Sequence, residues 1–351
     1  MNSPAHPPIS VVVVNYNCRV WLERFFPSLQ QQTIFEQVEI IIVDNTSTDG
    51  SAETCRQQMA AWPNGVFLPT GGNYGFGGGC NRGTKIARGK YLFFINPDVW
   101  LEPDCLEQLW RQAEAGAVRM ACPLVLDYDN EAVQTTGSLG FDLFGNVVAA
   151  KPEYQSTRRF SVGTFFFAAR ETFQKLGGFD EEFFLYNEEM DLSWRAWIAS
   201  EPVALIPTAR IHHQAASSGN RMVENRTGEK RRFFANRNQL LTILKNAHGP
   251  LLLLAFTQTF LMTAEALAGA LAARQLSFVR WALLKPLADC WRLRQHVFRQ
   301  RQFNQTIRCR GDWWLCRHFF RFSIGRWGDA KRLLQFGIKI DPAKPAISAK
   351  P

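Results

Sequence analysis

Three carboxylates lie close together in the segment Phe183–Arg195, whose sequence is FFLYNEEMDLSWR. Glu188, Glu189 and Asp191 fall within four positions, shortly after a Gly-Gly-Phe-Asp turn at 177–180. Carboxylates this close repel one another, so they suit a site that binds a cation or accepts a proton. They would also suit the acidic first turn of a helix, where the helix dipole stabilises negative charge. The segment alone leaves both interpretations open.

A second acidic motif, Asn96-Pro97-Asp98, ends a buried apolar run. A carboxylate in this position can hold Mg²⁺ or Mn²⁺ against phosphate oxygens, although Asn-Pro-Asp is also favourable in a turn. Two adjacent histidines, His212 and His213, follow a short apolar run at Val203–Ile206. In an extended segment their rings point to opposite sides, so we expect at most one of them to meet a metal ion.

Glycine is concentrated in residues 71–83, which read GGNYGFGGGCNRG. Glycine allows the backbone to approach a ligand closely and leaves amide groups free to bind phosphate. The dinucleotide-binding fingerprint GxGxxG does not occur in this stretch, which follows the third predicted strand rather than the first, and GxxxxGK[ST] is missing as well. The sequence leaves two interpretations of this stretch open, a nucleotide-binding loop and a simple flexible loop.

Strands and helices alternate in the region that must position these residues. Buried β-branched and aromatic runs predict strands at 9–15, 38–44, 66–69 and 91–95, and helical spacing predicts helices at 20–32, 50–62, 77–88 and 103–115. This order predicts an α/β fold with a doubly wound, mostly parallel sheet flanked by helices. Ligands bind such sheets at the carboxyl ends of the strands. Polar residues follow those ends at Asn15, Asp44-Asn45, 71–73 and 96–98, so we expect one site there.

The pattern weakens further along the chain. Residues 126–160 predict loops or an irregular β element, 160–169 predict a strand, and 222–245 predict a helix. The composition, 46% hydrophobic and 20% charged over 351 residues, is that of a globular protein. Eight cysteines without CxxC pairs argue against zinc clusters and fit reduced thiols in the cytoplasm. The N-terminus lacks the basic and apolar regions of a secretory signal, so none is expected.

The net charge of +9 is concentrated near the C-terminus. Residues 274–332 hold fourteen Lys and Arg against three Asp, whereas the first 273 residues carry a small negative charge. A basic segment of this kind suits an anionic membrane surface or a nucleic acid. Nothing in it resembles a nucleic-acid readout module, so we expect no nucleic-acid partner.

The segment Pro250–Ala273 contains one charge, Glu265, and is about as long as a membrane-spanning helix, which needs roughly 20 apolar residues. Several Thr and Gln residues dilute it, and the basic segment that follows is rich in Trp. Helices that lie on a membrane surface are the favoured interpretation. Packing on the catalytic domain or on a dimer partner, and a true spanning helix, stay open. We expect a catalytic domain at 1–246 and a basic, aromatic-rich helical extension at 247–351.

The motifs together resemble those of the family 2 glycosyltransferases of GT-A fold, most closely a bacterial rhamnosyltransferase-like branch that builds surface polysaccharides. The resemblance rests on six motifs that occur in this order: VVVVNYN, VDNTSTDG, GGNYGFGGGCNRG, FINPDV, GGFDEEFFLYNEEMDLSWR and IHHQAASS. It covers about Ile9–Gly219 and continues weakly to about Asn246.

The resemblance implies a role for each matching residue. A nucleotide-sugar pocket would be formed by Asn15, Asp44, Asn45, Asn73, Gly75, Phe76, Asn81 and Asn96. Asp44 would recognise the base or ribose. Asp98 would carry most of the coordination of Mg²⁺ or Mn²⁺, because Asn96 replaces the first acid of the usual Asp-x-Asp motif. His212 would be a second metal or diphosphate contact, with His213 a weaker choice.

The acidic motif departs from the family pattern, which usually reads Glu-Asp-x-Asp with the second acid as the catalytic base. Here it reads Glu188-Glu189-Met190-Asp191, and the longer Glu side chain leaves the base open among the three acids. We take Glu189 as the first choice.

The activity that the resemblance implies is transfer of a sugar, rhamnose among the candidates, from a dTDP- or UDP-linked donor to a hydroxyl of a glycan or lipid-linked acceptor. One base and no carboxylate nucleophile imply a single displacement that inverts the anomeric carbon. We expect the protein at the inner face of the cytoplasmic membrane. Two alternatives are an inactive nucleotide-sugar-binding protein and a sugar nucleotidyltransferase. The latter would need a GxGTRxxP-like loop where Asn15-Tyr16-Asn17 stands. The oligomeric state, a homodimer included, stays open.

Overall fold

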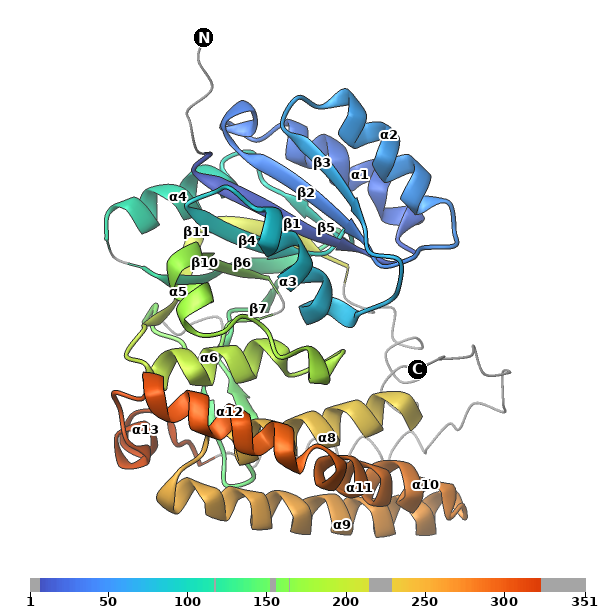
Figure 1. Cartoon of the computed structure of the whole chain (residues 1–351), viewed down its shortest axis with the longest axis vertical. Coiled ribbons are helices and arrows are strands. Elements are labelled where there is room, and N and C mark those ends of the chain that lie inside the picture. The colour runs from blue at the N-terminus through green and yellow to red at the C-terminus, as the bar shows by residue number, and fades with distance from the viewer. Residues whose placement is uncertain (1–6, 117, 152–155, 164, 215–228, 323–351) are drawn as a thin grey trace.

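The computed structural model describes residues 7–116, 118–151, 156–163, 165–214 and 229–322. Its first half alternates strands and helices as the sequence predicts (Figure 1). The elements are β1 (Ile9–Asn15), α1 (Arg19–Gln30), β2 (Glu39–Asp44), α2 (Ser51–Ala61), β3 (Gly65–Pro69), α3 (Gly75–Ile86) and β4 (Tyr91–Ile95), with a 3-10 turn η1 (Phe35–Gln37) before β2.

Shorter strands dominate the middle of the chain. They are β5 (Val99–Leu101), β6 (Met120–Asp127), β7 (Val133–Thr135), β8 (Ser138–Phe141), β9 (Val147–Ala149), β10 (Phe166–Ala169) and β11 (Val203–His213). The helices among them are α4 (Cys105–Glu114), α5 (Arg170–Lys175), the 3-10 turn η2 (Glu181–Phe183) and α6 (Glu188–Ile198). The irregular β element predicted for 126–160 is therefore three short strands. Strand β6 was not predicted, and β11 extends well beyond the apolar run at 203–206.

The strands form a mixed sheet in the order β3-β2-β1-β4-β10-β6-β11-β5, with β7 beside β6. Strands β3, β2, β1 and β4 are mutually parallel, and β10 runs antiparallel between β4 and β6. β11 is parallel to β6 and antiparallel to β5, and its register with β6 shifts between Ile206 and Arg210. Strands β8 and β9 pair separately. The predicted α/β fold with a doubly wound mixed sheet flanked by helices is confirmed, and its parallel part is β3-β2-β1-β4 together with the pair β6-β11.

Both faces of the sheet are covered, which explains the unbroken apolar strands. Alternate residues of β1 enter different cores: Val11 and Val13 pack with α1, α2 and α4, whereas Val12 and Val14 pack with α3, α5 and α6. The carboxyl ends of β1, β2 and β4 reach the same edge because Asn15 pairs with Asp44 and Val13 pairs with Ile95.

The last described part of the chain is helical. It consists of α8 (Glu229–Asn246), η3 (Gly249–Leu252), α9 (Leu253–Ala273), α10 (Ser277–Val279), the π-helical η4 (Arg280–Leu284), α11 (Lys285–Arg292), α12 (Arg294–Ile307) and α13 (Asp312–Phe319). Helix α8 contacts α6, α9, α11 and α12, and α9 forms the lower edge of the molecule in Figure 1. The first residues of the helix predicted at 222–245 lie outside the described residues, as do Ala215–Gly219 of the histidine motif.

Buried ion pairs join these helices to the catalytic part. The Lys245 ammonium of α8 is fully buried and contacts the carboxylates of Asp180 and Asp191, the latter at 3.0 Å. His296 of α12 also meets Asp180, with Nε2 2.8 Å from Oδ2. A buried charge is costly unless it is paired, so removing one partner would destabilise the whole junction.

Candidate active site

The ends of β1 and β2 present a polar rim. Asn15 donates from Nδ2 to Asp44 Oδ1 at 2.8 Å, and Asp44 Oδ2 accepts from the backbone amides of Thr46 and Ser47. Asn45 donates to the carbonyl oxygen of Gly75 at 2.8 Å. These hydrogen bonds fix the three predicted rim residues in one cluster at the mouth of the sheet.

Four buried oxygens of predicted site residues have no hydrogen-bond partner within the described protein. They are Asn15 Oδ1, Asn45 Oδ1, Asp98 Oδ1 and Glu188 Oε2. Buried polar atoms are nearly always paired, so each unpaired one calls for an explanation such as a water, an ion or a ligand. Their concentration on residues chosen from the sequence for nucleotide, metal and proton chemistry supports one binding site.

Asp98 follows β4 and faces a histidine of β11. Its Oδ2 lies 3.6 Å from Nε2 of His213, and both side chains are partly exposed. Nδ1 of His213 lies 2.5 Å from Oε1 of Gln134, which leaves Nε2 directed at the carboxylate. A ring held through one nitrogen while the other faces a carboxylate is typical of a metal-binding histidine. The residues therefore fit a divalent cation.

The role of His212 as a metal or diphosphate contact stays a prediction, but the histidine that faces Asp98 is His213. The ring of His212 is buried on the other side of β11, where Nδ1 lies 2.9 Å from the carbonyl oxygen of Asp127 and Nε2 lies 3.2 Å from Glu102 Oε1. It stacks on the indole of Trp100 with ring centroids 3.7 Å apart. The choice between the two adjacent rings depended on which side of the strand faces the site, and this alternates with each residue.

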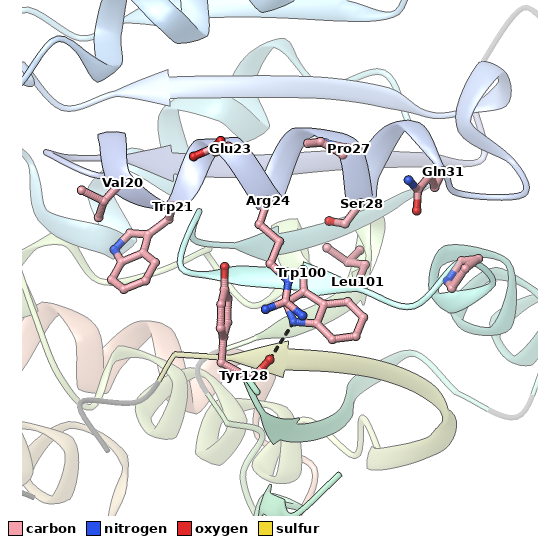
Figure 2. A pocket seen from close by; sticks show the side chains of 11 residues that line it. Val20, Trp21, Glu23, Arg24, Pro27, Ser28, Gln31, Trp100, Leu101 and Tyr128 are labelled. Atoms are coloured by element: carbon pink, nitrogen blue, oxygen red, sulfur yellow. Dashed lines mark hydrogen bonds between the residues drawn. The ribbon is translucent and has the colours of Figure 1, made fainter. Parts of the chain in front are cut away.

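Trp100 belongs to a separate cavity of about 660 Å³ between α1 and β5. Figure 2 shows the Arg24 side chain reaching from α1 toward Trp100 and Tyr128, and its guanidinium carbon lies 4.5 Å from each ring centroid. Trp100 also donates from Nε1 to the Tyr128 carbonyl oxygen at 3.0 Å. Trp100 is thus held between Arg24 and His212. The cluster anchors β5, which begins directly after Asp98.

Helix α6 begins with the predicted catalytic acids. Glu188 is buried, and burial together with the neighbouring Glu189 raises its pKa to about 8. Glu189 is only partly buried by surface area, and loss of hydration raises its pKa as well. A Cβ at Gly77 of α3 would lie 3.8 Å from the Cβ of Glu188, and Gly79 of the same helix faces Asn45. The acidic helix and the rim therefore border the same helix α3.

Asp191 is not available as a base. Its side chain is fully buried, pairs with Arg195 at 2.7 Å and Lys245 at 3.0 Å, and accepts from Asn246 at 2.8 Å. Burial alone would raise its pKa, but Lys245 and Arg195 outweigh burial and hold the pKa below its usual range. The candidate base is thereby narrowed to Glu189 or Glu188.

The loop before α6 has an unusual backbone. Phe184, Tyr186 and Asn187 all adopt φ between 62° and 72°, a region that residues other than glycine rarely occupy. Asn238 of α8 donates from Nδ2 to three carbonyl oxygens of this loop, those of Phe183, Leu185 and Tyr186, at 2.7–3.0 Å. Strained backbone persists where its surroundings over-determine it, and such strain is common at functional sites.

Arg237 strengthens the same contact. Its guanidinium donates to the carbonyl oxygens of Glu182 and Phe183 at 2.6 and 2.9 Å, and pairs with Asp289 of α11 at 2.9 Å. We name Arg237 and Asn238 the loop clamp. Sequence reasoning missed the clamp, although the polar run Asn236–Gln239 between the apolar residues 233–235 and 240–241 was a visible signal.

Most of the glycine-rich stretch is helical, so it is not a simple flexible loop, while its role in nucleotide binding stays a prediction. From Gly75 it forms α3, and its glycines allow close packing. A Cβ at Gly75, where φ is +70°, would lie 1.8 Å from the carbonyl oxygen of Phe184, and one at Gly83 would lie 2.4 Å from Val12. The glycines therefore bring α3 against β1 and against the loop that precedes the catalytic acids.

Three further predicted pocket residues are already engaged within the protein. Asn81 contacts the backbone of Phe179 through both ends of its amide, at 2.8 and 3.0 Å. Phe76 packs in the core against Phe179, and Asn73 accepts from the Gly75 amide at 2.9 Å. Asn81 and Phe76 both contact Phe179 of the Gly-Gly-Phe-Asp turn, and their place in the nucleotide-sugar pocket stays a prediction. Asn96 lies next to Asp98 and is partly exposed.

The raised pKa of Glu188 predicts a pH-dependent effect of the Glu188→Gln variant on stability. In the unfolded chain Glu188 ionises near its ordinary value of 4.5, whereas in the fold it stays protonated up to about pH 8. The native state then binds the extra proton, so the contribution of Glu188 is fully present below pH 4.5 and is lost as the pH rises through 8.

Thermal unfolding of both proteins without ligands checks this. We expect the Tm of Glu188→Gln relative to the unmodified chain to rise by more than about 3 °C between pH 5 and pH 8. A Tm difference that stays constant over this range would contradict the buried, proton-binding state of Glu188.

Comparison with solved structures identifies the class of fold. The chain aligns with a crystal structure of GalNAc-T7 with UDP, GalNAc and Mn²⁺ at a TM-score of 0.62 and 16% identity, over 95% of this chain and 59% of that one. It also aligns with S. aureus TarS 1–349 in complex with UDP, at a TM-score of 0.51 and 14% identity, over 85% and 90% of the two chains. The fold is that of the GT-A glycosyltransferases.

Sequence comparison gives the family. The model of glycosyl transferase family 2 matches residues 10–192, and the chain belongs to this family. An N-acetylglucosaminyl-diphospho-decaprenol L-rhamnosyltransferase of Mycobacterium tuberculosis is 28% identical over 246 residues, 60% of this chain and 78% of the relative. The putative glycosyltransferase EpsH of Bacillus subtilis is 32% identical over 124 residues, 35% of this chain and 36% of EpsH. The chain is a family 2 glycosyltransferase.

Proposed function

We propose that the protein transfers a sugar from a nucleoside-diphosphate donor to a hydroxyl group of a glycan acceptor, with inversion at the anomeric carbon. The observation that carries this proposal is the set of unpaired buried oxygens on Asn15, Asn45, Asp98 and Glu188. A ligand rich in hydroxyl, phosphate and base groups, together with a cation, would satisfy them.

The rim binds the nucleotide in this proposal. Asp44 and Asn15 form a rigid pair through their 2.8 Å hydrogen bond, and Asn45 stands beside them on β2. Asp98 and His213 hold Mg²⁺ or Mn²⁺, supported by the unpaired Asp98 Oδ1 and by the orientation of the His213 ring. A divalent cation bound there supplies positive charge that offsets the charge of the departing diphosphate.

Glu189 is the base in this proposal. A hydroxyl is a weak nucleophile near neutral pH, so a carboxylate within hydrogen-bond reach must accept its proton as the new bond forms. Glu189 is partly exposed, whereas Glu188 is buried and has a pKa of about 8, which keeps it protonated near pH 7. A protonated Glu188 cannot accept the proton, but it can donate a hydrogen bond to a ligand.

The finer identity of the substrates is proposed from the relatives. The mycobacterial relative is named for L-rhamnose transfer to a diphospho-decaprenol-linked sugar, and it covers 60% of this chain. We propose a dTDP- or UDP-linked hexose, rhamnose included, as donor, and a lipid-linked glycan at the cytoplasmic membrane surface as acceptor. The product would enter cell-surface polysaccharide synthesis.

Thermal-shift screening of nucleotide sugars with and without Mn²⁺ tests the proposal. A true donor should raise the Tm only, or much more strongly, in the presence of Mn²⁺, because a ligand that binds the native state stabilises it. Transfer or slow hydrolysis of that donor would then separate an enzyme from an inactive nucleotide-sugar-binding protein. Stabilisation by no nucleotide sugar would contradict the proposal.

A further inference from the structure

Helix α9 has an inverted distribution of polar and apolar residues. Every described side chain that it exposes is apolar: Leu253, Phe256, Phe260, Ala264, Leu267, Ala268 and Leu271. Five of these, Leu253, Phe256, Phe260, Leu267 and Leu271, are more than half exposed, with Phe256 at 73%, Phe260 at 71% and Leu271 at 80%. Its Gln258, in contrast, is fully buried. A surface helix in water normally exposes its polar side.

The exposed residues form one row, which we name the α9 row. They follow one another at intervals of three or four along Leu253, Phe256, Phe260, Ala264, Leu267 and Leu271, the spacing of one helix face. The opposite face, with Leu254, Gln258, Met262 and Ala266, is buried against the protein. Contiguous apolar surface of this kind marks a site of interaction with a protein or a membrane.

The surroundings of the row extend it and add positive charge. Thr257 donates to the carbonyl oxygen of Leu143 at 2.6 Å, so the half-exposed Leu143 lies beside the first turns of α9. Leu276 is 85% exposed just beyond the other end of the helix. The exposed Arg274 and Arg280 flank that end, and the chain that follows is strongly basic. Basic side chains beside an apolar row complement the headgroups of anionic lipids.

A membrane-spanning arrangement fits these contacts poorly. The segment Gly249–Leu271 is long and apolar enough to cross a bilayer by length and composition. However, α9 contacts α8, η4 and α10 along its buried side, and a Cβ at Gly269 would lie 2.3 Å from the ring of Phe278. A spanning helix would have to give up this packing and take Gln258 into lipid. One apolar side and one packed side suit a helix that lies in the plane of the membrane.

We propose that the α9 row is a membrane-docking surface that lies flat in the headgroup and upper acyl region of an anionic bilayer. The inference deepens the proposed function and rests on it for the nature of the acceptor, because it names the surface that brings the enzyme to a lipid-linked substrate.

A series of contacts connects the α9 row with Asn187, the residue before Glu188. The turn of the β8–β9 hairpin touches α9 through Leu143, and the Gly145 carbonyl oxygen of the same turn accepts from Gln239 of α8. Gln239 in turn accepts from Asn187, which precedes Glu188, at 2.8 Å. The hairpin and α8 therefore separate the membrane surface from the start of α6. The sugar of an acceptor anchored in the bilayer would therefore have to extend past the hairpin and α8 to reach the start of α6.

Vesicle sedimentation of the purified full chain tests the proposal. We expect binding to vesicles of phosphatidylglycerol and phosphatidylcholine, weaker binding to pure phosphatidylcholine, and a loss of at least about tenfold in Phe256→Glu/Phe260→Glu. Ile86→Glu, which changes a half-exposed apolar residue on α3, is the matched control and should bind like the unmodified chain. Circular dichroism shows that each variant is folded.

Two further measurements separate the alternatives. Size-exclusion chromatography tests whether a second copy of the chain covers the α9 row instead. The proposal would be overturned if the chain is a dimer and Phe256→Glu/Phe260→Glu makes it a monomer without changing its binding to vesicles. Unchanged vesicle binding in this variant would overturn it too. Transfer to a water-soluble acceptor should persist in the variant, whereas absence of transfer by a chain that still binds vesicles would count against the proposed function alone.

Discussion

Glu189→Gln should lower the turnover of sugar transfer by roughly 10²–10⁴-fold while the affinity for the donor stays nearly unchanged. The amide keeps the size of the side chain but cannot accept the proton of the acceptor hydroxyl. In the proposed site the donor is bound by the rim and by the cation at Asp98 and His213, which the substitution leaves in place. Steady-state kinetics with the identified donor measures turnover, and calorimetric titration of the donor measures its affinity.

Glu182→Gln is the matched control for this prediction. Glu182 lies in the same acidic region but exposes its side chain, and the loop clamp binds only its carbonyl oxygen. We expect its turnover to stay within about twofold of the unmodified enzyme. Near-normal turnover in Glu189→Gln, combined with a large loss in Glu188→Gln, would assign the base to Glu188.

Asp98→Asn should abolish the stimulation of transfer by Mn²⁺ or Mg²⁺ and lower turnover by about 10²-fold or more, because metal assistance contributes several kcal/mol to the transition state. Loss of the negative charge removes the stronger ligand and leaves His213 alone. Titration of Mn²⁺ by electron paramagnetic resonance measures the metal affinity directly, independently of activity.

Asp104→Asn serves as its control, since Asp104 precedes α4 and hydrogen-bonds to Gln108 at 2.9 Å. This variant should keep its Mn²⁺ affinity and its rate. An Asp98→Asn enzyme that binds Mn²⁺ normally would show that the cation lies elsewhere, and the Asp98–His213 pair would then need another explanation.

The sequence predicted the parallel half of the sheet well because its signals are local. Runs such as Val11–Val14 have no solvent-facing side, and the polar residues directly after them fall at one edge whenever the strands are parallel. The rim and Asp98 follow from that rule. The strands β7, β8, β9 and β10 have no comparable pattern, because each is only three or four residues long.

The errors concern contacts made by distant segments. The side of β11 that faces Asp98 depends on its pairing with β5 and on the register shift between Ile206 and Arg210, so His213 could not be preferred to His212. The glycines of α3 were assigned to ligand binding because their close neighbours, Val12 and Phe184, come from other parts of the chain. Of the charge partners of Asp191, Arg195 lies four residues later in the same helix, but Lys245 comes from α8 and could not be identified from the local sequence.

The division of the chain at residue 246 stays a prediction. Hydrogen bonds from α12 cross this boundary. Asn304 donates to Asn246 at 2.8 Å, and Arg301 donates to the carbonyl oxygens of Leu244 and Ala247. We propose that 247–351 is an extension of the catalytic domain in sequence, and that α11 and α12 complete its packing rather than form a separate folding unit.

The loop clamp also constrains the order of events during protein synthesis. Asn238 lies 52 residues after Tyr186, so the ribosome releases the catalytic acids well before the side chain that shapes their loop. Asp289, which pairs with Arg237, emerges later still. A nascent chain that already contains the whole sheet would therefore lack the clamp that shapes the loop before the proposed base, and we expect it to consume no nucleotide sugar until α8 and α11 have been synthesised.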